Sequence, residues 1–310
     1  MDHIDGSGAE DALRQRYMAA LEAFLDKVRP DPNVLAVVVG GSLAYDVLWE
    51  KSDIDVTVVV RDQLLRNESY SIDEDGIVLN LSMTTRSDFR RGLERMEGGS
   101  FGQAYFAKGR MVYSVDPSLE EFFEENRTIG VEDAALSVMG MAGMLISDLE
   151  KSRKWLVARR DPQYAQYYLI LCAETVAVME LCLRGEPASR AAIQKAMAFD
   201  PDLMHRVYTL PMSRLYISEE IEEAQRGLEA YLERNIDVIS RPVLAFLADG
   251  ELKTGTLISR HFHEDIHFLI LVFDWLVEKG VIERAARTIR ITPKGRQVFE
   301  EIGYLYAGPV

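Results

Sequence analysis

A glycine pair followed by two closely spaced aspartates constrains this chain more than any other feature of its sequence. The β-branched run at 37–39 leads into Gly40 and Gly41, and a second β-branched run begins around Asp53 and Asp55. Side chains at positions i and i+2 of a strand point to the same face, so we expect the two aspartates to converge. Two like charges held close together repel, and a divalent cation between them removes the repulsion. The pattern therefore predicts two strands, with a metal site at the start of the second.

The residues around the aspartates are suited to a phosphate group. Gly40 and Gly41 let the backbone approach a ligand closely, and their N–H groups, with the Ser42 hydroxyl, can donate hydrogen bonds to it. Lys51 and Ser52 directly precede the aspartates and are further candidates for phosphate contact, although a loop lysine usually lies in water. The pattern favours a bound nucleoside triphosphate with its metal. The alternative is a solvated hairpin with acids at its mouth.

The pattern of apolar strand, Gly-Ser, ten-residue spacer and Asp-x-Asp resembles the polymerase-β-type nucleotidyltransferases, most of all the branch that contains the aminoglycoside nucleotidyltransferases. The resemblance implies an α+β fold with a nucleotidyltransferase-type mixed sheet. It also implies that Asp53 and Asp55 are catalytic ligands of two Mg²⁺ ions, and that Gly41 and Ser42 contact the triphosphate. ATP or another nucleoside triphosphate would then be the substrate.

The family usually adds a third carboxylate, and alignment on the acid-Phe pair at 88–89 places that position on Asn80. An asparagine offers one neutral carbonyl oxygen, which coordinates Mg²⁺ weakly and cannot act as a base. We therefore include Asn80 as a metal ligand and expect this departure to bear on activity. The acidic residues at 73–75 are interpreted as an exposed turn rather than as substitutes.

Apolar periodicity and breaker residues divide the chain into three predicted domains. Residues 1–127 would form the catalytic domain, 128–239 a helical bundle that binds the acceptor, and 240–310 a winged-helix-like domain. In the last domain an arginine-rich hairpin at 287–296 would be the wing and would lead into a final helix. Strands are expected at 34–40, 54–60, 77–83 and 108–113, and helices at 9–28, 131–159, 164–183, 188–198, 201–208, 218–237 and 264–279.

Glu174 is a second candidate for the catalytic base. It lies on an otherwise apolar row of the 164–183 helix, where a carboxylate is either paired with a cation or raised in pKa. The aminoglycoside-modifying relatives take a base from their helical domain. The alternative is a glutamate buried against an arginine such as Arg153 or Arg159. Glu180 lies on a different face and is interpreted as structural.

The formal net charge of −15 limits the kinds of partner. Residues 240–310 carry nine basic and nine acidic side chains, so residues 1–239, with 26 basic and 41 acidic ones, hold the whole excess. Such a surface repels phosphate backbones and disfavours nucleic acid as a partner. It favours a cationic acceptor such as an amino-sugar, although acidity also serves solubility alone.

Other residues bear on the compartment and on metal binding. Cys172 and Cys182 lie ten residues apart in one predicted helix, about 15 Å along its axis at ~1.5 Å per residue, too far for a disulfide. With no secretory signal at the start, a reducing cytoplasm is the simplest setting. The 164–183 helix is apolar enough to be mistaken for a membrane span, but its glutamates favour a buried bundle helix. The histidines at 261, 263 and 267 are interpreted as incidental to a helix start.

These observations predict an Mg²⁺-dependent nucleotidyltransferase that moves a nucleoside monophosphate, AMP if the donor is ATP, to a hydroxyl of a small molecule such as an aminoglycoside-like amino-sugar. A protein acceptor stays open, as does a homodimer. One alternative is a nucleotide-binding regulator or sensor with weak or lost transferase activity, which the asparagine at position 80 supports. Another is a winged-helix transcription regulator, although four acids and one lysine between 263 and 279 are poor for phosphate contact.

Overall fold

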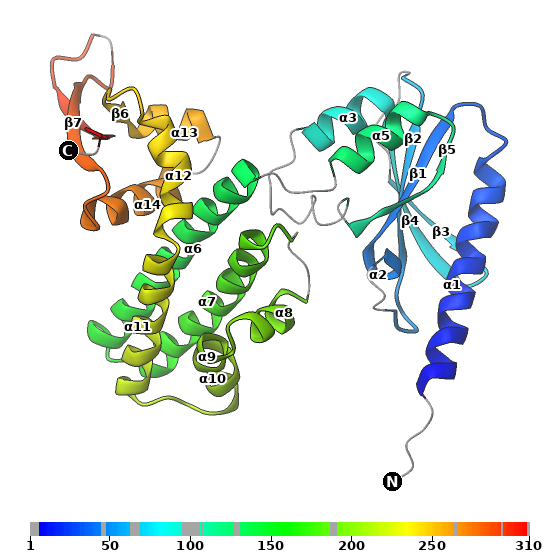
Figure 1. Ribbon diagram of the computed structural model, residues 1–310, viewed down its shortest axis with the longest axis horizontal. Coiled ribbons are helices and arrows are strands. Elements are labelled where there is room, and N and C mark those ends of the chain that lie inside the picture. Colours follow the sequence, from blue (N-terminus) through cyan, green and yellow to red (C-terminus); the bar gives the residue numbers. More distant parts are fainter. Residues whose placement is uncertain are drawn as a thin grey trace. The chain divides into compact units, whose positions relative to one another are not determined.

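The computed structural model of this protein describes residues 6–44, 48–62, 69–94, 106, 108–126, 131–186, 191–262, 266–292 and 294–308. The chain forms two compact units, Met1–Ile129 and Gly130–Val310. Both are drawn in Figure 1. The class is α+β, as predicted, because a mixed sheet with helices forms the first unit and helices with a small sheet form the second. The first boundary lies near the predicted one at 127/128, and a further division at 239 stays a prediction.

A five-stranded mixed sheet organises the first unit, with the order β3-β4-β2-β1-β5. Its central strands β2 and β4 are parallel, and every other neighbouring pair is antiparallel. Strand β3 was not predicted, because its sequence SYSIDE carries short polar residues typical of a turn. The strands are β1 (Val34–Gly40), β2 (Ile54–Val60), β3 (Ser69–Glu74), β4 (Ile77–Thr85) and β5 (Arg110–Ser114).

Helices cover both faces of this sheet (Figure 1). Helix α1 (Gly6–Val28) packs on one face, while α3 (Arg86–Glu94) and α5 (Pro117–Glu125) pack on the other. Alternate β1 residues point to opposite faces, so all seven residues of β1 are buried. Burying one valine side chain fully stabilises the folded state by roughly 1.5–3 kcal/mol. The β1–β2 pair is thus a rigid platform for the residues at its ends.

Asp116 fixes the start of α5. Its carboxylate accepts from the Ser118 backbone N–H at 3.1 Å and from the Ser118 hydroxyl at 2.6 Å, which caps the helix. Its other oxygen accepts from Arg86 Nε at 2.7 Å. The hydrogen bonds from Ser118 and then from Arg86 lower the pKa of Asp116 to about 2.

Asp116→Ala is expected to reduce the free energy of unfolding by about 1–2 kcal/mol at neutral pH, because α5 loses its cap and Arg86 its partner. The folded pKa lies below the ordinary value of 3.8, so the carboxylate contributes fully above about pH 4. That contribution is lost as the pH falls through about 2. Urea unfolding of both proteins at a series of pH values checks this. A stability difference that stayed constant from neutral pH to pH ~2 would contradict the assignment.

Helix α7 (Pro162–Leu183) forms the core of the second unit. It begins at the cap Asp161, whose side chain accepts from the Tyr164 N–H at 2.9 Å, with Pro162 at its first position. The helix is long and apolar enough to cross a membrane, but 61% of that apolar stretch is buried inside the protein. Burial as a bundle helix agrees with the prediction. The helices that accompany α7 are α6 (Val131–Val157), α8 (Ala192–Phe199), α9 (Pro201–Met204), the π-helical turn η1 (His205–Thr209), α10 (Leu210–Ser213), α11 (Ser218–Arg234) and α12 (Ile236–Phe246).

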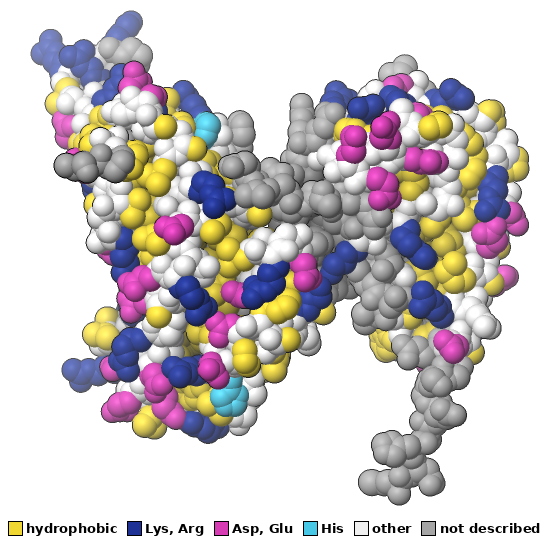
Figure 2. All heavy atoms as spheres, viewed as in Figure 1, with side chains coloured by type: hydrophobic (Ala, Val, Ile, Leu, Met, Phe, Trp, Pro, Cys, Tyr) yellow, Lys and Arg dark blue, Asp and Glu magenta, His cyan; other side chains and the backbone are white. Residues whose placement is uncertain are grey.

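The C-terminal part of the second unit combines two helices with a small sheet of order β6-β8-β7. Helix α14 packs against α6 so closely that a Cβ at Gly143 would lie 2.8 Å from the Phe268 carbonyl oxygen. Basic side chains gather at the end of the β7–β8 hairpin (Figure 2), where Arg290, Lys294 and Arg296 are exposed. The elements are β6 (Lys253–Thr254), α13 (Gly255–Phe262), α14 (Ile266–Glu278), β7 (Glu283–Ile289) and β8 (Phe299–Leu305).

The predicted final helix is wrong, because residues 299–305 form strand β8. Gly303, a poor helix residue, allows a close approach to β6: a Cβ there would lie 3.0 Å from the Lys253 carbonyl oxygen. Tyr304 is fully buried and donates its hydroxyl to Asp274 at 2.7 Å. Residues 299–305 therefore form a strand through pairing with β7 and β6.

Candidate functional site

A row of four residues crosses the sheet at the end of β1. Gly40 of β1 pairs with Asp55 of β2, Asp55 with Asn80 of β4, and Asn80 with Ser71 of β3. Neighbouring β2 residues Ile54 and Val56 pack on the α1 side, so Asp55 points to the opposite face. The parallel pairing of β2 with β4 therefore sets Asn80 beside Asp55.

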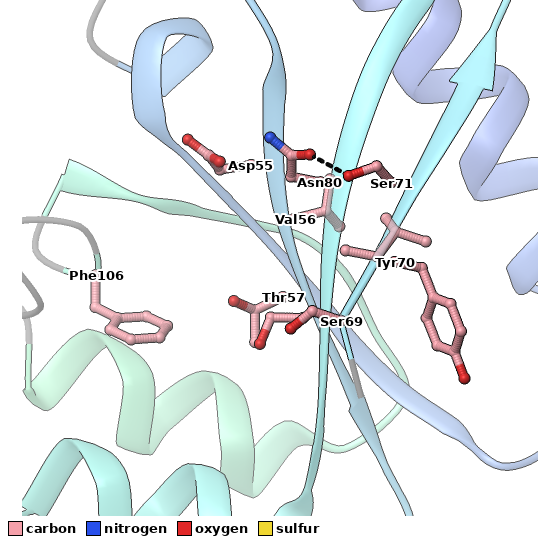
Figure 3. Close-up of a pocket in the computed structure, with 10 residues that line it drawn as sticks. Asp55, Val56, Thr57, Ser69, Tyr70, Ser71, Asn80 and Phe106 are labelled. Carbon is pink, nitrogen blue, oxygen red and sulfur yellow. Dashed lines mark hydrogen bonds between the residues drawn. The ribbon is translucent and has the colours of Figure 1, made fainter. Parts of the chain in front are cut away.

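The Asn80 amide connects this row to the other aspartate. Asn80 Nδ2 donates to Asp53 Oδ2 at 2.5 Å, and Ser71 Oγ donates to Asn80 Oδ1 at 2.8 Å. Figure 3 shows the amide between Asp55 and Ser71, with its oxygen toward Ser71. The structure thus links Asp53, Asn80 and Ser71 by hydrogen bonds next to Asp55.

Gly41 brings the backbone directly against the Asp55 carboxylate. Its φ is +65°, and a Cβ placed on it would lie 2.2 Å from Asp55 Oδ2. A side chain is excluded on both counts, since positive φ strains an L residue and 2.2 Å is far inside van der Waals contact. The glycine that the sequence singles out is therefore required by the carboxylate itself. Helix α2 (Gly41–Ala44) follows it, and the Ser42 side chain lies outside the described part of the chain.

Tyr17 holds the segment that carries Asp53, and sequence reasoning missed it as a site residue. Its side chain is 0% exposed, and its hydroxyl donates to the Ser52 carbonyl at 2.6 Å and lies 3.2 Å from the Trp49 carbonyl. The Ser52 hydroxyl accepts in turn from the Trp49 N–H at 3.1 Å. Burial raises the pKa of Tyr17, with Arg16 lowering it and Asp53 adding to the rise. The signal in the sequence was a tyrosine, with its polar hydroxyl, among the apolar residues of α1 that face the sheet.

Tyr17→Phe is expected to reduce the free energy of unfolding by about 1 kcal/mol, because the Ser52 carbonyl loses its hydrogen-bond donor. Since the Ser52 carbonyl adjoins Asp53, we also expect weaker binding of Mn²⁺. Tyr113→Phe is the matched control, because the Tyr113 hydroxyl lies 3.5 Å from the Arg29 carbonyl, outside the segment that carries Asp53. Chemical unfolding and Mn²⁺ titration of both variants check this. Equal effects in the two would contradict a positioning role for Tyr17.

A cavity of about 540 Å³ opens beside Asp55 (Figure 3). Hydroxyl groups from three strands line it, and Phe106 contributes an aromatic wall. The Phe106 ring packs edge-on against Phe89 of α3 and Phe123 of α5, which anchors that wall to the core. The volume lies in the range of small-molecule sites. The lining residues are Asp55, Val56, Thr57, Ser69, Tyr70, Ser71, Asn80, Leu81, Ser82 and Phe106.

Other predicted site residues have different surroundings. Lys51 is exposed, with its ammonium group 5.9 Å from the centre of the Trp49 ring. Glu174 is exposed on α7 of the second unit, so the alternative in which it is buried against an arginine is wrong. Position 174 lies on the solvent side of α7, whereas its neighbours 172, 173, 175 and 176 face the core and are buried. Its role as a base stays a prediction. Glu180 is buried and pairs with Arg184, as a structural residue would.

The acidic residues at 73–75 are only partly an exposed turn. Asp73 and Asp75 are exposed, and Asp73 accepts from the Gly76 N–H at 3.1 Å to close the β3–β4 hairpin. Glu74 is 7% exposed and pairs with Lys27 of α1 at 2.5 Å, so the prediction was wrong for this residue. The strand alternation of β3 turns it toward α1. Asp73 and Glu74 are thus engaged in structural contacts.

No other metal site emerges among the described residues. Within them, no group of three His, Cys, Asp or Glu side chains is arranged to hold an ion. The His261 ring stacks on Phe246 at 4.1 Å, while His263 lies outside the described residues. Cys172 and Cys182 are free and buried, and burial raises the pKa of both thiols.

Comparison with known proteins supports the fold. No protein-family model matches the chain, and no curated protein matches it. Among solved structures the chain is similar to a nucleotidyltransferase-like protein from Exiguobacterium sibiricum 255-15. The TM-score is 0.63 at 15% sequence identity, over 93% of this chain and 99% of that chain. At this identity the similarity shows the fold alone, and it confirms the predicted fold class. The aminoglycoside branch stays a prediction.

Proposed function

We propose that this chain is an Mg²⁺-dependent nucleotidyltransferase, which moves a nucleoside monophosphate from a nucleoside triphosphate to a hydroxyl group of a small molecule. The observation that carries the proposal is the close approach of the Gly41 backbone to the Asp55 carboxylate, in a row that continues to Asn80. Glycine at this point leaves space beside a carboxylate that any side chain would fill. A nucleotidyltransferase-like fold over nearly the whole chain adds to this support.

The donor atoms at the site fit a magnesium ion. Asp53 and Asp55 would hold it through carboxylate oxygens, the ligands that this ion prefers. When bound, the ion would neutralise negative charge on the triphosphate. In the cavity, the hydroxyls of Thr57, Ser69 and Ser82 can hydrogen-bond to a sugar or a phosphate, while Phe106 offers an apolar wall. ATP is our expected donor, and nothing at the described site distinguishes it from other nucleoside triphosphates.

The acceptor is inferred from charge. The acidic balance of residues 1–239 favours a cationic acceptor, and an aminoglycoside-like amino-sugar fits it. Glu174, exposed on α7, stays the proposed base for the acceptor hydroxyl, because the described residues contain no third carboxylate beside the aspartate pair. A homodimer and a cytoplasmic location remain part of the proposal, and buried free thiols agree with a reducing compartment.

A nucleotide-binding regulator with weak or lost transferase activity is the second candidate. The neutral Asn80 amide, hydrogen-bonded to Asp53 where relatives have a carboxylate, favours it. The order β6–α13–α14–β7–β8, with β8 between β6 and β7, supports a winged-helix-like arrangement that would suit a regulator. Its exposed basic hairpin end would be the wing.

Transfer of label from α-³²P-ATP with Mg²⁺, to a panel of aminoglycosides and to the protein itself, tests the proposal. Labelled product that is lost in the Asp53→Ala/Asp55→Ala double variant would support the transferase. Mg²⁺-dependent ATP binding that needs the same aspartates, but without transfer, would favour the regulator. If the protein neither bound ATP nor transferred the label, both the transferase and the regulator would be refuted.

A further inference from the structure

We propose that the site binds one divalent cation rather than two, and that Asn80 is a positioning residue for Asp53 instead of a metal ligand. This inference rests on the proposed function and concerns how the same site is loaded. It departs from the two-ion expectation that the family resemblance gives.

The orientation of the Asn80 amide follows from the chemistry of its partners. An ionised carboxylate can only accept hydrogen bonds, so the amide atom 2.5 Å from Asp53 Oδ2 must be the NH₂ group. The amide oxygen then faces β3, where the Ser71 hydroxyl donates to it at 2.8 Å. The one atom of Asn80 that could coordinate a cation is therefore engaged on the side away from Asp53.

The NH₂ group provides part of the positive charge beside Asp53 that a second ion would otherwise provide. It brings a partial positive charge against Asp53 Oδ2, in the position where relatives have a carboxylate. A cation near this oxygen would meet an N–H donor in place of a negative ligand, which disfavours its binding. Asp53 is thereby held in place, with one of its oxygens already accepting a hydrogen bond.

No described residue replaces the missing charge. The described residues contain no group of three metal-binding side chains. On β3, Glu74 is paired with Lys27, and Asp73 closes the hairpin through the Gly76 N–H. Asp53 and Asp55 supply two negative charges, enough to share one ion with a triphosphate, whereas two adjacent ions need further anionic ligands.

A single substitution reverses the proposed effect. Asn80→Asp restores the carboxylate with the same side-chain length, replaces the donor with an acceptor and is expected to admit a second ion. Without metal, three neighbouring carboxylates repel one another, so this variant should melt below the wild-type protein. Mn²⁺ should raise its melting temperature more than that of the wild type, because ion binding stabilises the folded state.

Native mass spectrometry with Mn²⁺ and a non-hydrolysable ATP analogue counts the ions in each protein–nucleotide complex. Electron paramagnetic resonance reports whether two Mn²⁺ ions are coupled at the ~3.5–4 Å separation of two-metal sites. We expect one ion in the wild type and in Asn80→Ala, and two coupled ions in Asn80→Asp.

The number of bound ions decides between the inference and its alternatives. Two ions in the wild type would overturn the inference and leave the proposed function standing, since the amide would then have turned over to let its oxygen ligate. One ion in both the wild type and Asn80→Asp would overturn the role of position 80. A protein that bound neither nucleotide nor Mn²⁺ would refute the proposed function and the inference together.

Discussion

Gly41→Ala is expected to lower the rate of nucleotidyl transfer by roughly 10²-fold while leaving the first unit folded. The new Cβ would lie 2.2 Å from Asp55 Oδ2, so either the carboxylate or the α2 backbone has to shift. A displacement of about 1 Å at a reacting centre can cost roughly 10²-fold in rate. The positive φ of +65° adds a backbone cost of about 1 kcal/mol to the folded state. Steady-state transfer rates and thermal melting measure the two effects separately.

Gly76→Ala is the matched control for this prediction. Gly76 also has a positive φ, +78°, in the β3–β4 turn of the same unit, but a Cβ there meets nothing within 4 Å. Both variants therefore carry a similar backbone strain, and Gly41→Ala alone crowds the carboxylate. We expect Gly76→Ala to lose stability with its transfer rate intact. If both variants kept the same activity, close approach at Gly41 would have no functional role.

Asp55→Asn is expected to lower the transfer rate by about 10³-fold, equal to a loss of ~4 kcal/mol in transition-state stabilisation. The amide keeps the size of the side chain but removes the charge that would hold the ion. Asp53→Asn is expected to lower the transfer rate as well. It would also place the new amide group at position 53 against the Asn80 amide. Transfer rates at saturating Mg²⁺ and ATP, with Mn²⁺ titration of each variant, measure the effect.

Asp75→Asn controls for the loss of one negative charge. Asp75 is exposed at the β3–β4 turn with a φ of +52°, a conformation that asparagine tolerates as well as aspartate. Its transfer rate and stability should stay close to those of the wild type. An Asp55→Asn protein that was as active as Asp75→Asn would show that Asp55 is not a ligand of a catalytic ion.

The sequence predicted the part of the site that local rules determine. Two β-branched runs form β1 and β2 within the expected limits, because residues buried on both faces leave a strong apolar signal. Gly41 was singled out for its backbone freedom, and the structure adds the reason, a carboxylate that excludes any Cβ. Position 80, which the alignment singled out, lies beside Asp55 in the parallel register of β2 and β4.

Features that depend on tertiary contacts could not be predicted. Strand β3 forms through its antiparallel pairing with β4, although its own residues favour a turn. Tyr17 was not identified as a site residue, because its hydrogen bond to the Ser52 carbonyl spans 35 residues of sequence. The exposure of Glu174 depends on which neighbours cover α7, and the orientation of the Asn80 amide depends on Ser71 from another strand. The final helix expected after the hairpin was likewise wrong, because residues 299–305 pair with β7.

The measurement that tests the central claim most directly compares ATP labelled at the α-phosphate with ATP labelled at the γ-phosphate. With Mg²⁺ and an acceptor such as an aminoglycoside, the account predicts that the α label appears on the acceptor. The γ label should be released as pyrophosphate, and both signals should vanish in the Asp53→Ala/Asp55→Ala variant. Transfer of the γ label to the acceptor, or α-label transfer that survived in the double variant, would contradict nucleotidyl transfer at this site.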